Sequence, residues 1–99
     1  MIKIKMKIAE NVFNCKISGH SGYAEYGKDI VCASISTLIL FLERYKCKKH
    51  EIINSSIESG NSDISVIING NDAVIDTFIE MVCNIAEQYP NNVAIKYDK

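Results

Sequence analysis

The stretch GHSGYAEYGKDIVC, residues 19–32, lies where the pattern of the chain changes from strand to helix. Before it, apolar and polar residues alternate, which is typical of a half-buried strand. Within it, three of the five glycines permit backbone conformations closed to other residues. After it, a long apolar run predicts a buried helix. The stretch also holds one of the two histidines and one of the four cysteines, which makes it the candidate functional segment.

Length and composition are those of an ordinary globular protein. The 99 residues predict a single domain over 1–99, and 47% are hydrophobic and 23% charged. The net charge of −1 predicts no direct nucleic-acid or membrane binding. The N-terminal residues alternate instead of forming a continuous apolar block, so we expect no secretory signal. We therefore expect a cytoplasmic protein whose cysteines are reduced thiols.

Two strands precede the central stretch. Residues 1–8 and 12–18 both alternate between apolar and polar side chains, and a short turn joins them into an antiparallel hairpin. The alternation places Cys15 among the apolar side chains of the core. If it continues, it places His20 on the polar side with Ser18.

The first predicted helix covers about residues 30–45, with Asp29 as its N-cap. It has almost no polar face, so part of its surface is expected to be covered by a second subunit. A basic cluster follows at its C-terminal end, where cations suit the helix dipole. This cluster and its two neighbours are interpreted as surface residues: Arg44, Lys46, Cys47, Lys48, Lys49 and His50.

The second half of the chain predicts another hairpin and a second helix. Strands at 52–59 and 64–68 turn about Gly60-Asn61, a glycine-containing pair favoured in hairpins. An amphipathic helix at 73–89 and a short strand at 93–97 follow. The order is ββαββαβ, so we expect an α+β, two-layer sandwich in which two helices cover a five-stranded mixed or antiparallel sheet.

The central stretch pairs a thiol with an imidazole. Cys32 lies three residues after Asp29, in the first turn of the helix, where free N–H groups and the helix dipole favour a thiolate. His20 lies across a glycine-rich loop that can fold back toward the sulfur. A thiolate beside a histidine is a pair used in nucleophilic catalysis.

Other residues of the segment have supporting roles in this hypothesis. N–H groups at the helix start, Gly19 or Gly22 would hold a developing oxyanion. Asp29 either caps the helix or orients His20. Ser36 lies one turn beyond Cys32 and either faces the site or bonds back to the helix. Tyr23 and Tyr26 would pack over the site or close it.

Three alternatives stay open from the residues alone. Cys32 fits a structural thiol as well as a nucleophile. A zinc site of Cys15, His20 and Cys32 lacks a fourth ligand and paired spacing. A non-catalytic ribosome- or RNA-associated module would use the lysines of residues 1–8 and the basic cluster at 44–49. In the simplest interpretation those N-terminal lysines form a solvated face or protect an edge strand.

The motif itself narrows these alternatives. Residues 19–24, GHSGYA, and 26–33, YGKDIVCA, closely resemble the signature G-H-[AS]-G-Y-A-x-x-G-x-D-I-V-C-A-A-V-S of the ribosomal-processing cysteine proteases, the Prp (YsxB-like) family. The resemblance covers the whole chain in length and element order. Ser34 and Ile35 stand where the family usually has alanine and valine, and both changes are small.

The resemblance implies a function that the residues alone do not reach. Members of the family remove an N-terminal extension from a large-subunit ribosomal protein, the twenty-seventh of its series, by cutting after aromatic residues. It implies Cys32 as nucleophile and His20 as general base and acid, without a cofactor or metal. It further implies a homodimer, and a loop between His20 and the helix that moves to admit peptide. The roles implied for the remaining site residues are support from Asp29 and Ser36 and shaping of the backbone by Gly19, Gly22 and Gly27.

Overall fold

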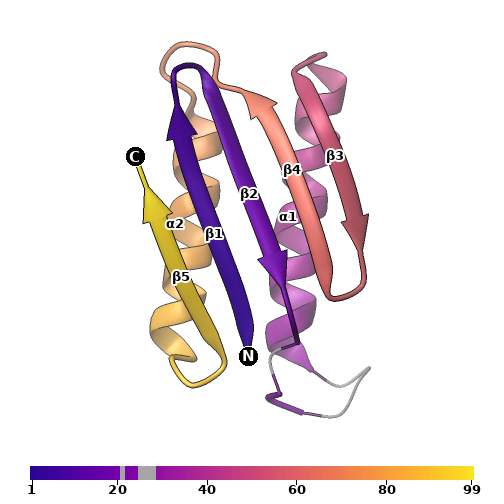
Figure 1. Cartoon of the computed structure of the whole chain (residues 1–99), viewed down its shortest axis with the longest axis vertical. Helices are drawn as coiled ribbons and strands as arrows, with labels where there is room; N and C mark the ends of the chain where they lie inside the picture. The colour runs from indigo at the N-terminus through magenta and orange to yellow at the C-terminus, as the bar shows by residue number, and fades with distance from the viewer. Residues whose placement is uncertain (21, 25–28) are drawn as a thin grey trace.

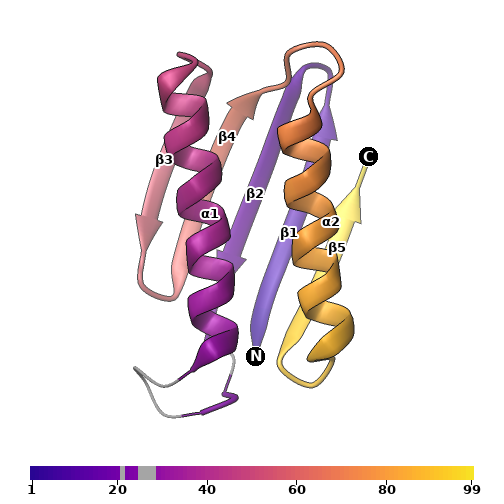
Figure 2. The same cartoon turned by 180° about the vertical axis from the view of Figure 1, so that it is seen from behind.

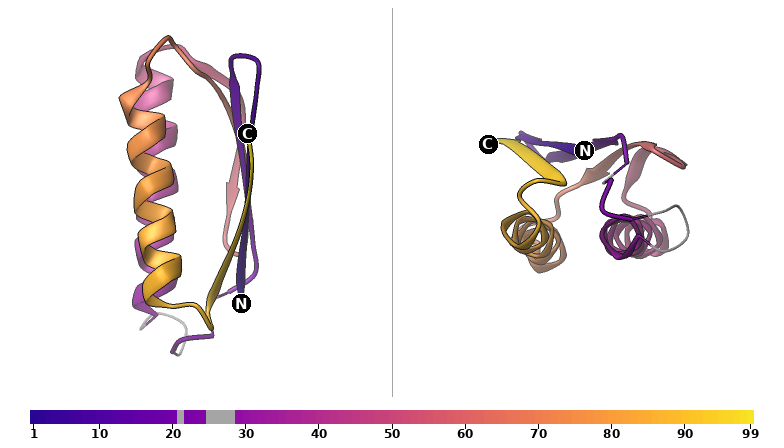
Figure 3. Two further views of the ribbon diagram at one scale, coloured as in Figure 1. Left: turned by 90° about the vertical axis from the view of Figure 1, so that its left-hand side faces the viewer. Right: turned by 90° about the horizontal axis from the view of Figure 1, so that it is seen from below.

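The computed structural model describes residues 1–20, 22–24 and 29–99 and has the predicted order of elements. They are β1 (Ile2–Ala9), β2 (Val12–Ser18), α1 (Ile30–Lys48), β3 (Ile52–Glu58), β4 (Asn61–Ile67), α2 (Ala73–Gln88) and β5 (Val93–Asp98). The strands form one sheet (Figure 1), and α1 and α2 lie side by side on one face of it, nearest the viewer in Figure 2. Both views in Figure 3 show the two layers, which confirms the predicted α+β sandwich.

The sheet is mixed, with the strand order β3-β4-β2-β1-β5. Strands β1 and β5 pair in parallel, and the other neighbours pair antiparallel. Because β1 lies between β2 and β5, the interpretation of its lysines as guards of an edge strand is wrong. In the part of the chain that the structure describes, no helix is long and apolar enough to cross a membrane.

The core lies between the sheet and the helices. The inner faces of β1 and β2 alternate as predicted, and Cys15 is 0% exposed among them. Phe13 of β2 meets Phe78 of α2 edge to face, with ring centroids 5.9 Å apart. On α1 the buried side chains recur every three or four residues at Val31, Ile35, Ile39, Leu42 and Lys46.

The turn and the second strand of the second hairpin begin earlier than predicted. Ser59 and Gly60 form its turn, and Gly60 has a φ of +73°. Strand β4 therefore starts at Asn61 instead of residue 64. The reason is Ser62, which is only 7% exposed and occupies an inner position where the hydrophobic pattern predicts an apolar residue. The first helix also continues beyond the predicted residue 45, to Lys48.

Lys46 is not part of a surface cluster, because its side chain is only 1% exposed. It continues the buried stripe of α1, so its ammonium group meets the end of the sheet. There its Nζ donates to Glu51 Oε1 at 2.8 Å, to Asp72 Oδ2 at 2.5 Å and to the Ile67 carbonyl at 2.7 Å. A buried cation of this kind is tolerated only when it is paired and hydrogen-bonded. The contacts join α1 to β3, β4 and the N-cap of α2.

The hydrogen bonds of Lys46 shift the pKa values of the three ionisable groups in this cluster. Burial by itself would lower the pKa of Lys46, but the bonds to Asp72 and Glu51 outweigh it and raise that pKa. The bond from Lys46 lowers the pKa of Glu51. Burial would raise the pKa of Asp72, yet the same ammonium group lowers it. The cluster therefore stabilises the fold fully between about pH 5 and pH 10, and less at either extreme.

We predict that Lys46→Met lowers the free energy of unfolding at pH 7 by about 3–5 kcal/mol, because it leaves two buried carboxylates unpaired. The loss shrinks in acid, where these carboxyls take up protons. Urea unfolding followed by circular dichroism measures both values. Lys48→Met, two residues further along and exposed, is the matched control and costs less than about 0.5 kcal/mol. Equal losses in the two variants would contradict the role of Lys46.

Candidate active site

Cys32 is held in the first turn of α1 by the helix cap. Asp29 has extended backbone angles, and its Oδ1 accepts the N–H groups of Val31 and Cys32, both at 3.0 Å. The predicted N-cap is thereby confirmed. The thiol of Cys32 is half-buried. It therefore lies at the positive end of a 19-residue helix.

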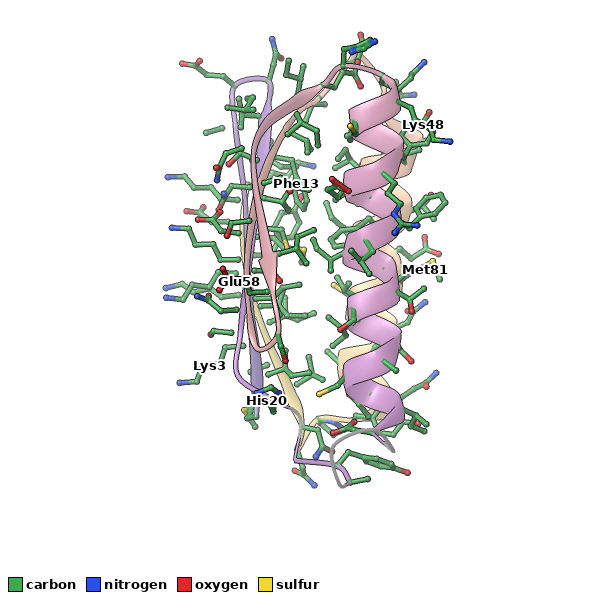
Figure 4. All side chains as sticks on the ribbon, turned by 90° about the vertical axis from the view of Figure 1, so that its right-hand side faces the viewer. Lys3, Phe13, His20, Lys48, Glu58 and Met81 are labelled. Atoms are coloured by element: carbon green, nitrogen blue, oxygen red, sulfur yellow. The ribbon has the colours of Figure 1, made fainter. Side chains whose placement is uncertain are left out.

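His20 reaches the helical side of the sheet because Gly19 changes the direction of the chain. Gly19 has a φ of +90°, and a Cβ there would lie 2.4 Å from the Met1 carbonyl oxygen. Only glycine fits this position. The alternation of β2 therefore stops at Ser18, so the condition for placing His20 beside Ser18 is not met, and His20 lines the cavity with Cys32. Figure 4 shows His20 at the end of the molecule where the central stretch enters α1.

Cys32 and His20 line the same cavity, whose volume is about 760 Å³. Asp29, Ser36 and Gly22 also line it, so the structure brings these predicted residues together. Ser34, by contrast, donates to the Ile30 carbonyl within the helix. The apolar walls come from both layers and consist mainly of Ile2, Ile17, Ile35, Ile39, Leu40 and Ile57.

The turn between β3 and β4 forms the wall next to His20. The N–H of Gly19 donates to the Gly60 carbonyl at 2.9 Å, so this N–H is occupied instead of facing an oxyanion. A Cβ on Gly60 would lie 2.8 Å from His20 Nε2 and 3.0 Å from His20 Cε1. The imidazole therefore packs directly on the backbone of Gly60, and the absence of a side chain there sets the position of the ring.

The remaining predictions for the segment have mixed outcomes. Tyr23 packs edge to face on Tyr89 at 5.3 Å and does not line the cavity. The expectation that Tyr23 covers the site therefore stays a prediction. Tyr26 and Gly27 lie outside the described residues.

The other three cysteines occupy different environments. Burial, with a smaller contribution from Asp63, raises the pKa of Cys15 to about 12. Burial also raises the pKa of Cys83, helped by Glu87. Cys47 is exposed on α1, as predicted. Cys15 is in the core and does not line the cavity, so the structure does not assemble the zinc alternative. Among residues 1–20, 22–24 and 29–99, no three potential ligands are grouped to hold a metal ion.

Sequence reasoning missed the β3–β4 turn as part of the site. Glu58, Ser59 and Gly60 line the cavity, although they lie far from the central stretch in sequence. A glycine in a hairpin turn indicates the local backbone conformation but does not indicate which distant residue it contacts. The only relevant signal was the alternation of β2 and β4, and pairing between these two strands cannot be read from it.

The family model for the cysteine protease Prp matches residues 1–94. The chain belongs to the Prp cysteine protease family. It is therefore a peptide hydrolase, and the resemblance of its central stretch to the Prp signature is confirmed over nearly the whole chain. No curated protein sequence matches the chain.

Several solved structures have a fold similar to that of this chain. Ribosomal processing protease Prp from S. aureus, in complex with a covalently linked product peptide, is 25% identical with a TM-score of 0.83, covering 98% of this chain and 99% of that one. The same protease with a substrate peptide is aligned at 21% identity and a TM-score of 0.76, with the same coverage. SMU.848 from Streptococcus mutans is 22% identical with a TM-score of 0.71, covering 100% and 96%.

We predict that Gly60→Ala displaces the His20 ring, because the new methyl group would meet Nε2. The chain has two histidines, so His20 and His50 give separate ring signals in NMR spectra. The His20 signals shift in this variant.

The matched control is Gly70→Ala. Gly70 also has a positive φ, +61°, but a Cβ there meets nothing within 4 Å. Both variants have a similar backbone cost of about 1–2 kcal/mol. An unchanged His20 signal in Gly60→Ala, or an equal shift in Gly70→Ala, would disprove the contact.

Proposed function

We propose that this Prp-family protease removes the N-terminal extension of a large-subunit ribosomal protein, the twenty-seventh of its series. It cuts after aromatic residues with Cys32 as nucleophile and His20 as general base and acid. The observation that carries this proposal is the shared cavity, in which a thiol at a helix start and an imidazole face the same space. S. aureus Prp, which has the same fold, is a ribosomal processing protease, and this supports the class of substrate.

The first chemical step forms a covalent bond between enzyme and peptide. His20 takes the proton of the Cys32 thiol, and the sulfur attacks the carbonyl carbon of the scissile peptide bond. The tetrahedral intermediate then loses its C–N bond, and the imidazolium gives its proton to the departing amine. The product of this step is a thioester on Cys32 and a free mature N-terminus. The covalently linked product peptide on S. aureus Prp supports a covalent route.

The second step returns the enzyme to its starting state. His20 removes a proton from water as the oxygen attacks the thioester carbon. The C–S bond breaks, the imidazolium returns its proton to the departing sulfur, and the extension leaves as a carboxylic acid. Neither of the two steps uses an oxidant, a metal or a cofactor.

The cap residue has a role in positioning. Asp29 accepts the Cys32 N–H and thereby fixes the first turn that carries the sulfur. Ser36 lines the cavity one helical turn beyond Cys32 and can hydrogen-bond to the substrate backbone. Since the N–H groups of Gly19, Val31 and Cys32 are already bonded, Gly22 is the remaining candidate named by the sequence for holding the oxyanion.

Specificity for aromatic residues is supported by the cavity walls. Isoleucine side chains from β2, β3 and α1, with Leu40, give the space an apolar lining. Burying an aromatic side chain against such walls supplies much of the energy of peptide binding. We expect the aromatic residues of the extension to occupy this lining, with the scissile carbonyl held between Cys32 and His20.

The working form is proposed to be a cytoplasmic homodimer. Three apolar side chains of α1 are exposed: Ile30 by 53%, Leu40 by 39% and Phe41 by 60%. Leu40 and Phe41 also line a second depression of about 490 Å³ on the outer side of α1. A second copy that covers this surface would remove the apolar area from water.

We predict that Cys32→Ala and His20→Ala each lower the rate of precursor cleavage by at least about a thousandfold. The measurement incubates each variant with the extended ribosomal protein and follows the masses of both products. Cys47→Ala, which removes an exposed thiol of the same helix, stays within about twofold of wild type.

Two outcomes would count against the proposal. One is an intact precursor after incubation with wild-type enzyme. The other is cleavage by Cys32→Ala at the rate of Cys47→Ala. Alkylation gives a second measure: iodoacetamide at neutral pH should modify Cys32 ahead of the exposed Cys47.

For the dimer, we predict that Phe41→Glu shifts sedimentation from dimer to monomer, because it buries a charge at the proposed contact. Met81→Glu is the matched control, since Met81 is a 44% exposed apolar residue on α2. It lies on the outer side of the helical layer in Figure 4. If the wild type sediments as a monomer, or if both variants dissociate equally, α1 is not the dimer contact.

A further inference from the structure

Five lysines gather on the sheet face that the helices leave open. Side chains of β1 alternate, so Lys3, Lys5 and Lys7 point away from the core, and all three are exposed. Register places Lys16 of β2 opposite Lys5 on one side, and Lys96 of β5 opposite Lys5 on the other. We call these five residues the lysine face. Figure 4 shows Lys3 pointing away from the helical layer.

Lys5 is the centre of this arrangement. Its two cross-strand partners and its two same-face neighbours along β1 are all lysines. In a sheet such neighbours lie about 5 Å apart across strands and about 7 Å apart along a strand. Acidic residues of this face lie around the lysines: Asp63 is directly opposite Lys16, Asp98 is directly opposite Lys7, and Glu58 is on the outer strand β3. Asp63 also accepts a hydrogen bond from the Asn14 side chain.

The central row of this arrangement, Lys96, Lys5 and Lys16, costs the folded protein stability by itself. Like charges directly opposite each other destabilise a sheet. Protection of an edge does not account for it, because β1 is an inner strand. Within the described residues, both ion pairs belong to Lys46, and neither involves the lysine face. Five of the eleven Lys and Arg residues of a chain with net charge −1 are thus placed together.

We propose that the lysine face binds the phosphate backbone of an RNA strand. The spacing of its ammonium groups is of the same order as that of successive phosphates. No aromatic side chain of the described residues points from this face, so binding depends on charge and not on base stacking. RNA is preferred over an acidic protein or a membrane because the substrate class of the proposed function is a ribosomal protein, which assembles on RNA. In this one respect the inference rests on the proposed function.

The lysine face and the cavity do not compete for space. The cavity opens beside α1 and is lined by Cys32 and His20 at the end of the helical layer. Figure 3 shows both helices on one face of the sheet, and the alternation of β1 places the lysine face on the opposite one. The protease can therefore rest on RNA through its sheet while a peptide enters from the helical side.

The test measures fluorescence anisotropy of a fluorescein-labelled, mixed-sequence single-stranded RNA about 20 nucleotides long. The variant Lys5→Gln, Lys16→Gln, Lys96→Gln removes the central row. The control Arg44→Gln, Lys48→Gln, Lys49→Gln makes the same change of charge on exposed residues of α1 and its C-cap. For wild type, log K against log salt should have a slope of about −3 to −4 between about 50 and 200 mM salt.

The central-row variant should lose at least about tenfold in affinity at the lower salt concentration, and its slope should fall by about 2. The control should stay within about threefold. Absence of RNA binding by wild type, or equal losses in the two variants, overturns the proposal. So does equal competition by poly-glutamate or by phosphatidylserine vesicles at matched charge, which would indicate an acidic protein or a membrane instead. Because no peptide is present, a failure of the proposed cleavage leaves this result unaffected.

Discussion

The buried ammonium group of Lys46 fixes the rotation of α1, and the position of the site follows from it. Its bonds to Glu51 just before β3, to the Ile67 carbonyl of β4 and to Asp72, the N-cap of α2, anchor the C-terminal end of the helix. Cys32 lies fourteen residues earlier, about 21 Å along the axis and about 40° around it. The thiol therefore lies beside the buried stripe of the helix, where it is half-buried and open to the cavity. A rotation of α1 by one residue would carry it into the core or into solvent.

Burial and helix position separate the four thiols of this chain. Cys15, inside the core, has its pKa raised to about 12, so it holds its proton at any physiological pH. Cys83 is affected in the same direction. Cys32 differs because it is half-buried in the first turn of α1, where its N–H is bonded to the cap residue and its side chain lines the cavity. The same amino acid thus has a different environment at each of these places in the fold.

The sequence predicted most of this architecture, because its patterns are local. Alternation in residues 1–8 and the cap at Asp29 each report on a few neighbouring residues, and the structure confirms both. What the sequence did not predict depends on residues that meet only after folding. In the sequence, Lys46 resembles any other cation at a helix end, because its partners Glu51 and Asp72 meet it only in the folded chain. In the sequence, Gly60 resembles an ordinary turn residue, because its contact with the His20 ring exists only in the folded chain.

For the same reason, the net charge of the chain does not describe how charge is distributed over the surface of the folded protein. A value of −1 sums over the whole chain, whereas a partner meets one face at a time. Three of the five lysines are visible as an alternating run in β1, but Lys16 and Lys96 join them only through the register of two neighbouring strands. The helices bury the opposite face of this sheet and hold the thiol at its end. A two-layer fold with helices on one side only therefore provides two separate surfaces, one for peptide chemistry and one for charge.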